Sequence, residues 1–567
     1  GNFVLHLRAS AYGEYQGNQI ETTFTNNVAI VDGREYEISF RAKWLAGKSL
    51  LNSRLYFNRL ARTVQLAVPP RNGTPGAPNS RAAGNLGPTY QNLSHQPVVP
   101  DPGQPVTVSV EASDPDGVDS LDLWYSVSGG TWQRVAMSDT IPSSASIPGQ
   151  PAASVVQFYV AGADPHGAVS TFPAGGTNSR ALYRVQDNQA GGGSLRNFRI
   201  IMTPADAAFL HTGTNTLSNE LLGCTVVDNE REVFYDAGVR LKGSFVGRNV
   251  DRVGFHVQFQ PDRLFRGVHP KVAVDRSQHT AIGGIGEILA KHLAGHAGGM
   301  PNMYDDLARF IAPLPSYTSM SALRLAGFDE EYLDSQYPSG SEGPLHEPEV
   351  IRWMLNTVDG RPESPKAPGN EGGGTGWVGY DLQSYGDNPE SYRWTFPLLI
   401  NRTTADLSAP MAVCQTFSLA GTNLAARSEQ VLDVDEWLRV LAFQVLIGPA
   451  DAYYTGGTYH NYRLYRRPSD GRTLYMPWDW DSAFMASASA PLVASYNVTK
   501  LINLSGNYRR YLNHLYDLIT TTFNTAYASP WASRYSALSG QDFSGVVGYI
   551  GRSEERRVGK ECRSRWS

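Results

Sequence analysis

The chain has 567 residues, with 48 basic and 53 acidic side chains and 3 cysteines. This length exceeds what one hydrophobic core supports, so we expect several domains. The net charge of −5 gives no electrostatic reason to expect nucleic acid as a partner, no apolar run is long enough to span a membrane, and the cysteines are too few for a disulfide framework or a zinc site.

The first predicted module occupies residues 1–69. Apolar and polar residues alternate there in short segments between Gly, Asn and Asp turns, which predicts an all-β sandwich. The segment Tyr36 to Trp44 resembles a strand of jelly-roll carbohydrate-binding modules. We favour a buried core role for Trp44 and Tyr15, and the resemblance offers stacking on the sugar rings of cell-surface glycan as the alternative. Because the chain starts at Gly1 with neither methionine nor signal peptide, we expect a fragment or processed form in which this module is truncated.

Three segments are predicted to lie outside the folded domains. Residues 70–102 are rich in Pro, Gly, Asn and Ser, which is typical of a linker, and the glycine-rich residues 187–194 predict a flexible joint. The tail 552–567 changes to a basic composition without periodicity and resembles translated sequencing-adapter read-through, so we exclude it from the predicted fold.

Residues 103–186 predict a second β module. Strict alternation from Val106 to Val127 and the apolar run Val155 to Val160 indicate strands of an immunoglobulin- or fibronectin-like sandwich. Between the first strands lies the turn Asp114-Pro115-Asp116-Gly117. We interpret its carboxylates as solvated turn residues, with Ca²⁺ binding as the alternative.

Residues 195–551 predict an α+β domain with a glycine-containing hairpin. One strand ends at Lys242, a turn with Gly243 and Gly247 follows, and a second strand runs from Gly254 to Phe259. A phosphate-covering loop is built in this way, because backbone without Cβ can approach phosphates closely. Any glycine-containing hairpin would give the same pattern.

A helix is predicted from Ile285 to Leu293, and it carries Glu287. In protein kinases a helix at this place supplies the Glu that pairs with the phosphate-binding cation. The alternative is a solvated carboxylate that pairs with Lys291 one turn later.

The next informative stretch begins with a helix. Asp433 predicts its N-cap, with Glu436 as the capping-box partner. Apolar residues then recur at helical spacing as far as Leu446, and Gly448-Pro449 ends the helix.

Three oxygen-bearing side chains surround the β-hairpin predicted from Tyr462 to Met476. Asp451 follows the helix, Asn461 directly precedes the hairpin, and Asp479 directly follows it. A phosphoryl-transfer site uses this order of parts: one Asp orients the attacking hydroxyl and accepts its proton, while an Asn and a second Asp hold the Mg²⁺ that bridges the nucleotide phosphates.

Two further residues near the hairpin are candidates of lower rank. Asp481 is a weaker choice for a second metal ligand, and His460 is the substitute for Asn461. Each Asp could instead be an ordinary turn residue at a strand end. The ordered set favours a site, since Trp478 and Trp480 indicate a buried setting in which an unpaired carboxylate is costly.

The segment His460 to Asp481, HNYRLYRRPSDGRTLYMPWDWD, resembles the signature of the CotH kinase family, the spore-coat-protein-H-like atypical protein kinases. The segment Gly238 to Asn249, GVRLKGSFVGRN, resembles the N-lobe motif of that family. The resemblance implies transfer of the γ-phosphoryl group of ATP, with Mg²⁺ or Mn²⁺, to Ser or Thr of a protein substrate. The accompanying β modules favour an extracellular or cell-envelope bacterial protein.

The sequence departs from the family at one place. CotH proteins usually carry a lysine pair where this chain has Arg252-Val253, and the resemblance assigns phosphate contact to Arg252. A guanidinium does not simply replace a lysine point charge, although Lys242 or Arg240 could reach the phosphate instead.

Two alternatives to an active kinase follow. The first is a catalytically degenerate extracellular scaffold whose β modules bind glycan or protein, which the departure at Arg252 favours. The second is a glycoside hydrolase that uses Asp479 and Asp481. It ranks last, because two carboxylates two residues apart at a strand end do not straddle one bond.

Overall fold

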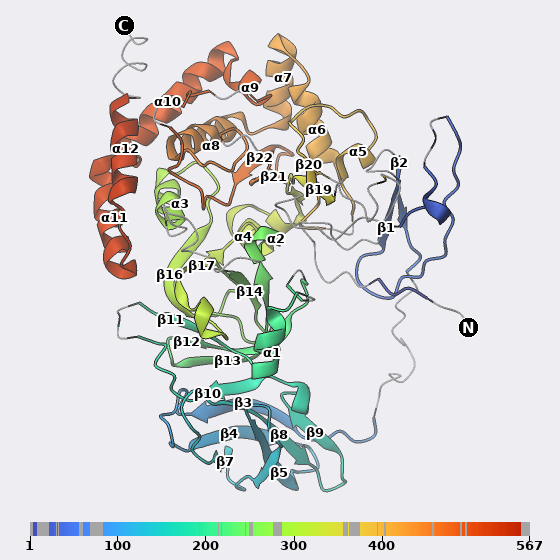
Figure 1. Ribbon diagram of the computed structural model, residues 1–567, viewed down its shortest axis with the longest axis vertical. Coiled ribbons are helices and arrows are strands. Elements are labelled where there is room, and N and C mark those ends of the chain that lie inside the picture. The colour runs from blue at the N-terminus through green and yellow to red at the C-terminus, as the bar shows by residue number, and fades with distance from the viewer. Residues whose placement is uncertain are drawn as a thin grey trace. The chain divides into compact units, whose positions relative to one another are not determined.

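The computed structural model describes most of the chain (Figure 1). The residues described are 4–7, 22–29, 31, 33–55, 60–68, 83–191, 193, 195–213, 215–216, 218–243, 245–248, 253–275, 286–354, 361, 375–393, 395–401, 404–455, 459–487, 490–493 and 496–556.

Two compact units make up the chain. The first consists of residues 1–70, 280–305 and 326–567, and the second consists of residues 71–279 and 306–325. Strands dominate the second unit, whereas the first is largely helical (Figure 1). A mostly β N-terminal region followed by a helical C-terminal region is therefore confirmed, while the domain bounds drawn from the sequence stay predictions.

The second unit begins with two antiparallel sheets. One has the order β3-β4-β7, and the other has the order β10-β8-β5-β6 with β9 paired to β8 (Figure 1). Val108, Leu123 and Phe158 lie in one apolar core that both sheets share. The strands are β3 (Thr89–Gln96), β4 (Val106–Ser113), β5 (Ser120–Val127), β6 (Gln133–Ala136), β7 (Ser143–Ile147), β8 (Val155–Ala163), β9 (Val169–Phe172) and β10 (Ala181–Arg184).

A closed barrel follows in the same unit, with the strand order β11-β12-β13-β14-β15-β17-β16. Phe198, Phe234 and Phe255 are buried in its apolar core. Thr203 caps the short helix after β11 by accepting a hydrogen bond from the Asp206 amide. The elements are β11 (Asn197–Ile201), α1 (Pro204–Leu210), β12 (Leu222–Asp228), β13 (Glu232–Lys242), α2 (Phe245–Arg248), β14 (Gly254–Gln258), β15 (Lys271–Val274), β16 (Tyr304–Ile311) and β17 (Ser319–Ala326).

A buried histidine joins the sheets to the barrel within this unit. His95 of β3 is 1% exposed, and its Nδ1 contacts the hydroxyl of Tyr235 on β13. Its Nε2 lies 3.0 Å from the carbonyl oxygen of Val98. Burial lowers the pKa of His95 to about 4, against the opposing effect of the Val98 carbonyl. The imidazole is therefore neutral near pH 7.

The N-terminal part of the first unit differs from the expectation. Its described residues form one hairpin, β1 (Leu50–Leu55) with β2 (Leu60–Gln65). Residues 34–49, which include the predicted strand from Tyr36 to Trp44, contain no strand. The sandwich predicted for 1–69 is therefore absent from the described residues, because alternation alone makes no sheet unless a neighbouring strand takes up the backbone hydrogen bonds.

Helices form most of the remaining first unit. Helix α8 is buried along nearly its whole length, and α10 packs beside it (Figure 1). None of the described helices combines the length and hydrophobicity needed to cross a lipid bilayer. The helices are α3 (Gly286–Ala297), α4 (Glu330–Gln336), α5 (Glu390–Arg393), α6 (Ser408–Phe417), α7 (Gly421–Val431), α8 (Val434–Ile447), α9 (Thr499–Ile502), α10 (Ser505–Thr521), α11 (Thr525–Ser539) and α12 (Ser544–Arg556).

A small sheet packs against α8. It has the order β18-β21-β22, and Trp437 of α8 donates a hydrogen bond to the Thr473 carbonyl of β22 at 2.8 Å. The hairpin predicted from Tyr462 to Met476 is thereby confirmed. The remaining elements are β18 (Leu345–His346), β19 (Ile351–Met354), β20 (Thr375–Val378), β21 (Tyr462–Arg466), β22 (Thr473–Pro477) and the 3₁₀ turns η1 (Thr25–Asn27), η2 (Gly176–Asn178), η3 (Pro315–Tyr317) and η4 (Gly340–Glu342).

The predicted capping box of α8 is wrong, although its helix is confirmed. Asp433 occupies the N-cap without a side-chain cap bond, and its carboxylate pairs with Arg467 at 2.9 Å. Glu436 turns instead toward β22, where it accepts a hydrogen bond from the Tyr475 amide at 3.1 Å. Burial raises the pKa of Glu436 well above its ordinary value, and the Tyr475 amide opposes this only in part.

Candidate functional site

The end of α8 fixes where the site loop begins. Gly448 ends the helix with a left-handed φ of +53°, as the sequence predicted. A Cβ at this position would lie 2.3 Å from the Tyr549 hydroxyl oxygen and 2.5 Å from Cβ of Ala486. Glycine is therefore needed both for the backbone conformation and for the close packing.

The loop after α8 is anchored on both sides of Asp451. The Asp451 amide donates to Oγ of Ser482 at 3.1 Å, and the Asn461 side-chain amide donates to the Asp451 carbonyl oxygen. Two residues on, Tyr453 is buried, and its hydroxyl donates to Asp381 at 2.6 Å. The carboxylate of Asp451 nevertheless stays accessible, because its side chain is 51% exposed.

The hairpin brings Asn461 and Asp479 to one end of the sheet. Tyr462 of β21 is paired with Pro477 of β22, and the Trp478 amide donates to the Asn461 carbonyl at 3.2 Å. Both residues have left-handed backbone, with φ of +63° for Asn461 and +58° for Asp479. Non-glycine residues seldom adopt this conformation, and such residues concentrate at functional sites.

The donor atoms at this end suit a hard cation. The Nδ2 of Asn461 is used by the Asp451 carbonyl, which leaves Oδ1 as the ligand atom. Asp479 is partly buried, and within the described part of the chain its carboxylate makes no hydrogen bond or ion pair. Asp481 is likewise partly buried, in the turn that follows.

His460 lies between two carboxylates. Its Nε2 is 2.9 Å from Oδ1 of Asp451, and its Nδ1 is 3.6 Å from Oε1 of Glu349. Burial lowers the pKa of His460, but the hydrogen bonds with Asp451 and Glu349 outweigh it and raise the pKa to about 10. His460 as the substitute for Asn461 among the metal ligands stays a prediction.

A second buried ion pair holds the residue before Asp479. Arg463 of β21 lies 3.0 Å from a carboxylate oxygen of Glu347, which is 4% exposed. The same guanidinium stacks over Trp478, with 4.9 Å between Cζ and the ring centroid. Trp478 is thereby fixed directly before Asp479. The contacts of Glu347 and Glu349 could not be predicted, because nothing in the local sequence links these residues to partners more than a hundred positions later.

Residues 401–541 match the sequence model of the family described as CotH kinase protein. Residues 401–541 are therefore similar to CotH kinase proteins. Asp451, Asn461 and Asp479 all lie inside the matched residues. The match is shorter than the 195–551 over which the motifs resemble the family.

Other comparisons add little to the CotH match. No match was found among curated proteins. A solved structure titled "Crystal structure of Br derivative BhCBM56" is similar at 10% identity with a TM-score of 0.13, covering 17% of this chain and 88% of that chain. A TM-score this low carries no argument about fold or function.

Glu287 lies outside the CotH match but contacts it. Trp480 lies between Asp479 and Asp481 in the sequence, and its amide donates a hydrogen bond to Oε1 of Glu287 at 3.2 Å. The same oxygen is 2.9 Å from Nζ of Lys291, which also lies 2.5 Å from Asp305. The i,i+4 pair with Lys291 is therefore present, but it is buried, not solvated, with Glu287 3% exposed.

The glycine motif lies in the second unit. Lys242 ends β13 and pairs with Asp275, which also pairs with Arg324 at 3.2 Å. Gly243 has a φ of +103° and leads into α2, which contains Gly247. Lys242 is paired with Gly254 across β13 and β14, so the predicted hairpin is confirmed, with a short helix in its connection.

Three arginines lie in or near this motif in the sequence. Arg240 donates to the Asn219 side chain at 3.1 Å and to the Leu241 carbonyl at 3.0 Å. Arg252, the residue to which the resemblance assigns phosphate contact, lies outside the described residues. Arg248 was not predicted; it is 8% exposed, and its Nε donates to the Gly243 carbonyl at 2.6 Å.

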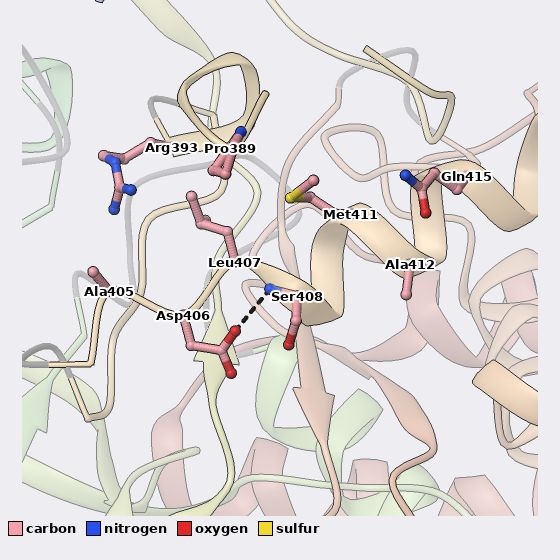
Figure 2. Close-up of a pocket in the computed structure, with 9 residues that line it drawn as sticks. All are labelled: Pro389, Arg393, Ala405, Asp406, Leu407, Ser408, Met411, Ala412 and Gln415. Carbon is pink, nitrogen blue, oxygen red and sulfur yellow. Dashed lines mark hydrogen bonds between the residues drawn. The ribbon is translucent and has the colours of Figure 1, made fainter. Parts of the chain in front are cut away.

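A surface pocket of about 480 Å³ lies beside the N-terminal end of α6 (Figure 2). The Ser408 amide donates to Oδ1 of Asp406 at 2.8 Å (Figure 2). The Asp406 carboxylate therefore accepts a hydrogen bond from the first residue of α6. None of the residues that line the pocket is a predicted site residue, and we assign it no part in the chemistry. Its lining residues are Pro389, Arg393, Ala405, Asp406, Leu407, Ser408, Met411, Ala412 and Gln415.

Proposed function

We propose that this chain is an atypical protein kinase of the CotH type, which transfers the γ-phosphoryl group of ATP to Ser or Thr of an exported or surface protein. The observation that carries the proposal is the convergence of Asp451, Asn461 and Asp479 at one end of the β21–β22 hairpin, inside the CotH match. The two-sheet β module of the second unit supports an extracellular or cell-envelope location.

Asn461 and Asp479 would hold the divalent cation. An amide oxygen and a carboxylate are hard ligands, and this donor set fits Mg²⁺ or Mn²⁺. Asp481 is a weaker candidate for a further ligand. When bound, the cation would neutralise phosphate charge and ATP would supply the phosphoryl group.

Asp451 would act on the acceptor hydroxyl. Its exposed carboxylate can orient the hydroxyl and accept its proton. His460, 2.9 Å away and positively charged, fixes the orientation of that carboxylate. His460 is thus a positioning residue in this proposal.

The resemblance also implies phosphate contact by the glycine motif of the second unit. Lys242 and Arg252 supply positive charge, Gly243 and Gly247 supply backbone that can approach the phosphates, and Glu287 supplies the carboxylate of a kinase-type ion pair. The resemblance to the CotH N-lobe motif supports this part. Lys242 would have to share its charge between Asp275 and the phosphate.

The test is thermal stabilisation by ATP with Mg²⁺ or Mn²⁺, combined with mass spectrometry of phosphate transfer to casein and to the chain itself. The wild type is expected to gain several degrees, because a ligand that binds only the folded state stabilises it. Asp479→Asn should lose the gain and the transfer. Asp470→Asn, at the opposite end of the same hairpin, should keep both. A wild type without any gain would contradict the proposal and favour the degenerate scaffold.

A further inference from the structure

Two turns of the β module have the same hydrogen-bond pattern. Asp114-Pro115-Asp116-Gly117 connects β4 to β5, and Asp164-Pro165-His166-Gly167 connects β8 to β9. In each turn the first Asp accepts a hydrogen bond on Oδ1 from the amide two residues later, at 2.8 Å in the first and 2.9 Å in the second. The Asp119 amide donates to the Ala163 carbonyl at 2.8 Å, which holds the two turns side by side.

The turns bring three carboxylates together. Asp114, Asp116 and Asp164 each offer an oxygen atom, and these atoms lie within 4.8 Å of one another. Within the described part of the chain, no ion pair joins any of the three to a basic side chain. Three negative charges at this separation repel one another in a partly desolvated place.

Asp164 carries the second and independent observation. It is 2% exposed, and its Oδ1 accepts hydrogen bonds from the amides of His166 and Ala168. Its Oδ2 is buried and has no hydrogen-bond partner. The Asn85 side chain also lies beside this carboxylate. A buried carboxylate oxygen without a partner is costly, and a bound cation would supply the partner.

We infer that these two turns form a Ca²⁺ site, distinct from and independent of the proposed kinase centre. Three carboxylates from two turns match the oxygen-rich, adaptable coordination of Ca²⁺ better than the strict octahedron of Mg²⁺. Asp116 is exposed, so solvent can reach the cation and complete its shell. Asn85 offers a further amide oxygen. Ca²⁺ would cancel the repulsion and tie the two turns together.

The experiment is calorimetric titration of the full chain with CaCl₂ after chelator treatment. Asp479→Asn serves as the background throughout, so that the proposed kinase cation site does not contribute. We expect one bound Ca²⁺ and a rise in the melting temperature, with a Kd of about 1 mM or tighter. Asp116→Asn should weaken binding about tenfold or more and, because this side chain is exposed, leave the fold intact. Asp164→Asn should abolish binding.

Asp139→Asn is the matched control, since it removes an exposed carboxylate of the same module outside the cluster. It should bind Ca²⁺ as the background does. Unchanged binding in Asp116→Asn would overturn the inference, and so would a chain that shows neither heat nor stabilisation at about 10 mM CaCl₂. Loss of ATP binding in Asp479→Asn leaves this result unaffected, so the two proposals fail separately.

Discussion

Nε2 of His460 lies 2.9 Å from Oδ1 of Asp451, on a loop whose other anchor is the Ser482 side chain. This contact joins the residue before Asn461 to the carboxylate that the kinase proposal assigns to the acceptor hydroxyl. Glu349 lies on the far side of the same imidazole. The charge of His460 is therefore shared between two acidic side chains that would otherwise repel each other.

His460→Gln should separate positioning from cation binding. We expect phosphoryl transfer to fall by about tenfold or more, because a neutral amide holds the Asp451 carboxylate less firmly. The stabilisation by ATP and Mn²⁺ should persist, since Asn461 and Asp479 are untouched. The loss should appear in kcat with little change in KM for ATP. Unchanged transfer in this variant would remove His460 from the mechanism.

Gly448→Ala should destabilise the first unit more than Gly540→Ala does. Both glycines end helices with left-handed backbone, at φ of +53° and +71°, so alanine costs about 1 kcal/mol at either place. At Gly448 a Cβ would also meet Tyr549 and Ala486, whereas at Gly540 it would meet nothing within 4 Å. We expect an additional loss of about 2 kcal/mol at Gly448, measured by urea unfolding. Equal losses would contradict the packing described for the start of the site loop.

Acid should weaken the second unit through His95. The pKa of His95 in the folded chain, about 4, lies below the ordinary value of 6.5. Between these pH values the unfolded chain binds a proton at His95 and the folded chain does not. Stability is therefore fully present above pH 6.5 and is lost as the pH falls toward 4, by about 2 kcal/mol between pH 7 and pH 5. His95→Gln should remove this part of the pH dependence, and exposed His166→Gln should keep it. Identical pH profiles for the wild type and His95→Gln would show that His95 is not the responsible group.

Glu436 should make the stability of the first unit fall as the pH rises, which is the opposite of the effect of His95 on the second unit. Burial raises its pKa in the folded chain, so the unfolded chain releases its proton first as the pH rises above the ordinary value of 4.5. Stability from this group is present at low pH and declines toward the raised pKa. Glu436→Gln, which resembles the neutral acid, should melt at or above the wild-type temperature at pH 8. Glu429→Gln, on the exposed face of α7, should leave it unchanged.

Local patterns located the elements of the site but not their long-range partners. Helical spacing and Gly448 gave the bounds of α8, and alternation gave β21 and β22, because these signals depend on neighbours in the sequence. The capping box at Asp433 was wrong because Arg467, distant in the sequence, competes for the same carboxylate. The contact between Glu349 and His460 could not be predicted for the same reason.

Alternation misled in the N-terminal module. The segment Tyr36 to Trp44 has the pattern of a strand, yet no partner strand takes up its backbone hydrogen bonds in the described residues, and it is not a strand. In the β module the same pattern at Val106 to Ser113 succeeded, because β3 and β7 lie on either side of it. The Ca²⁺ alternative at Asp114 needed Asp164, fifty residues later, before it could be argued.

Binding of Mn²⁺ in the presence of ATP, followed by electron paramagnetic resonance, tests the central idea that Asn461 and Asp479 hold one cation. Asp164→Asn as the background removes the β-module carboxylates from the measurement. We predict that Asn461→Ala and Asp479→Ala each weaken binding by about tenfold or more, and that the double variant is scarcely weaker than either. Wild-type affinity in Asp479→Ala, or losses that simply add, would contradict the account.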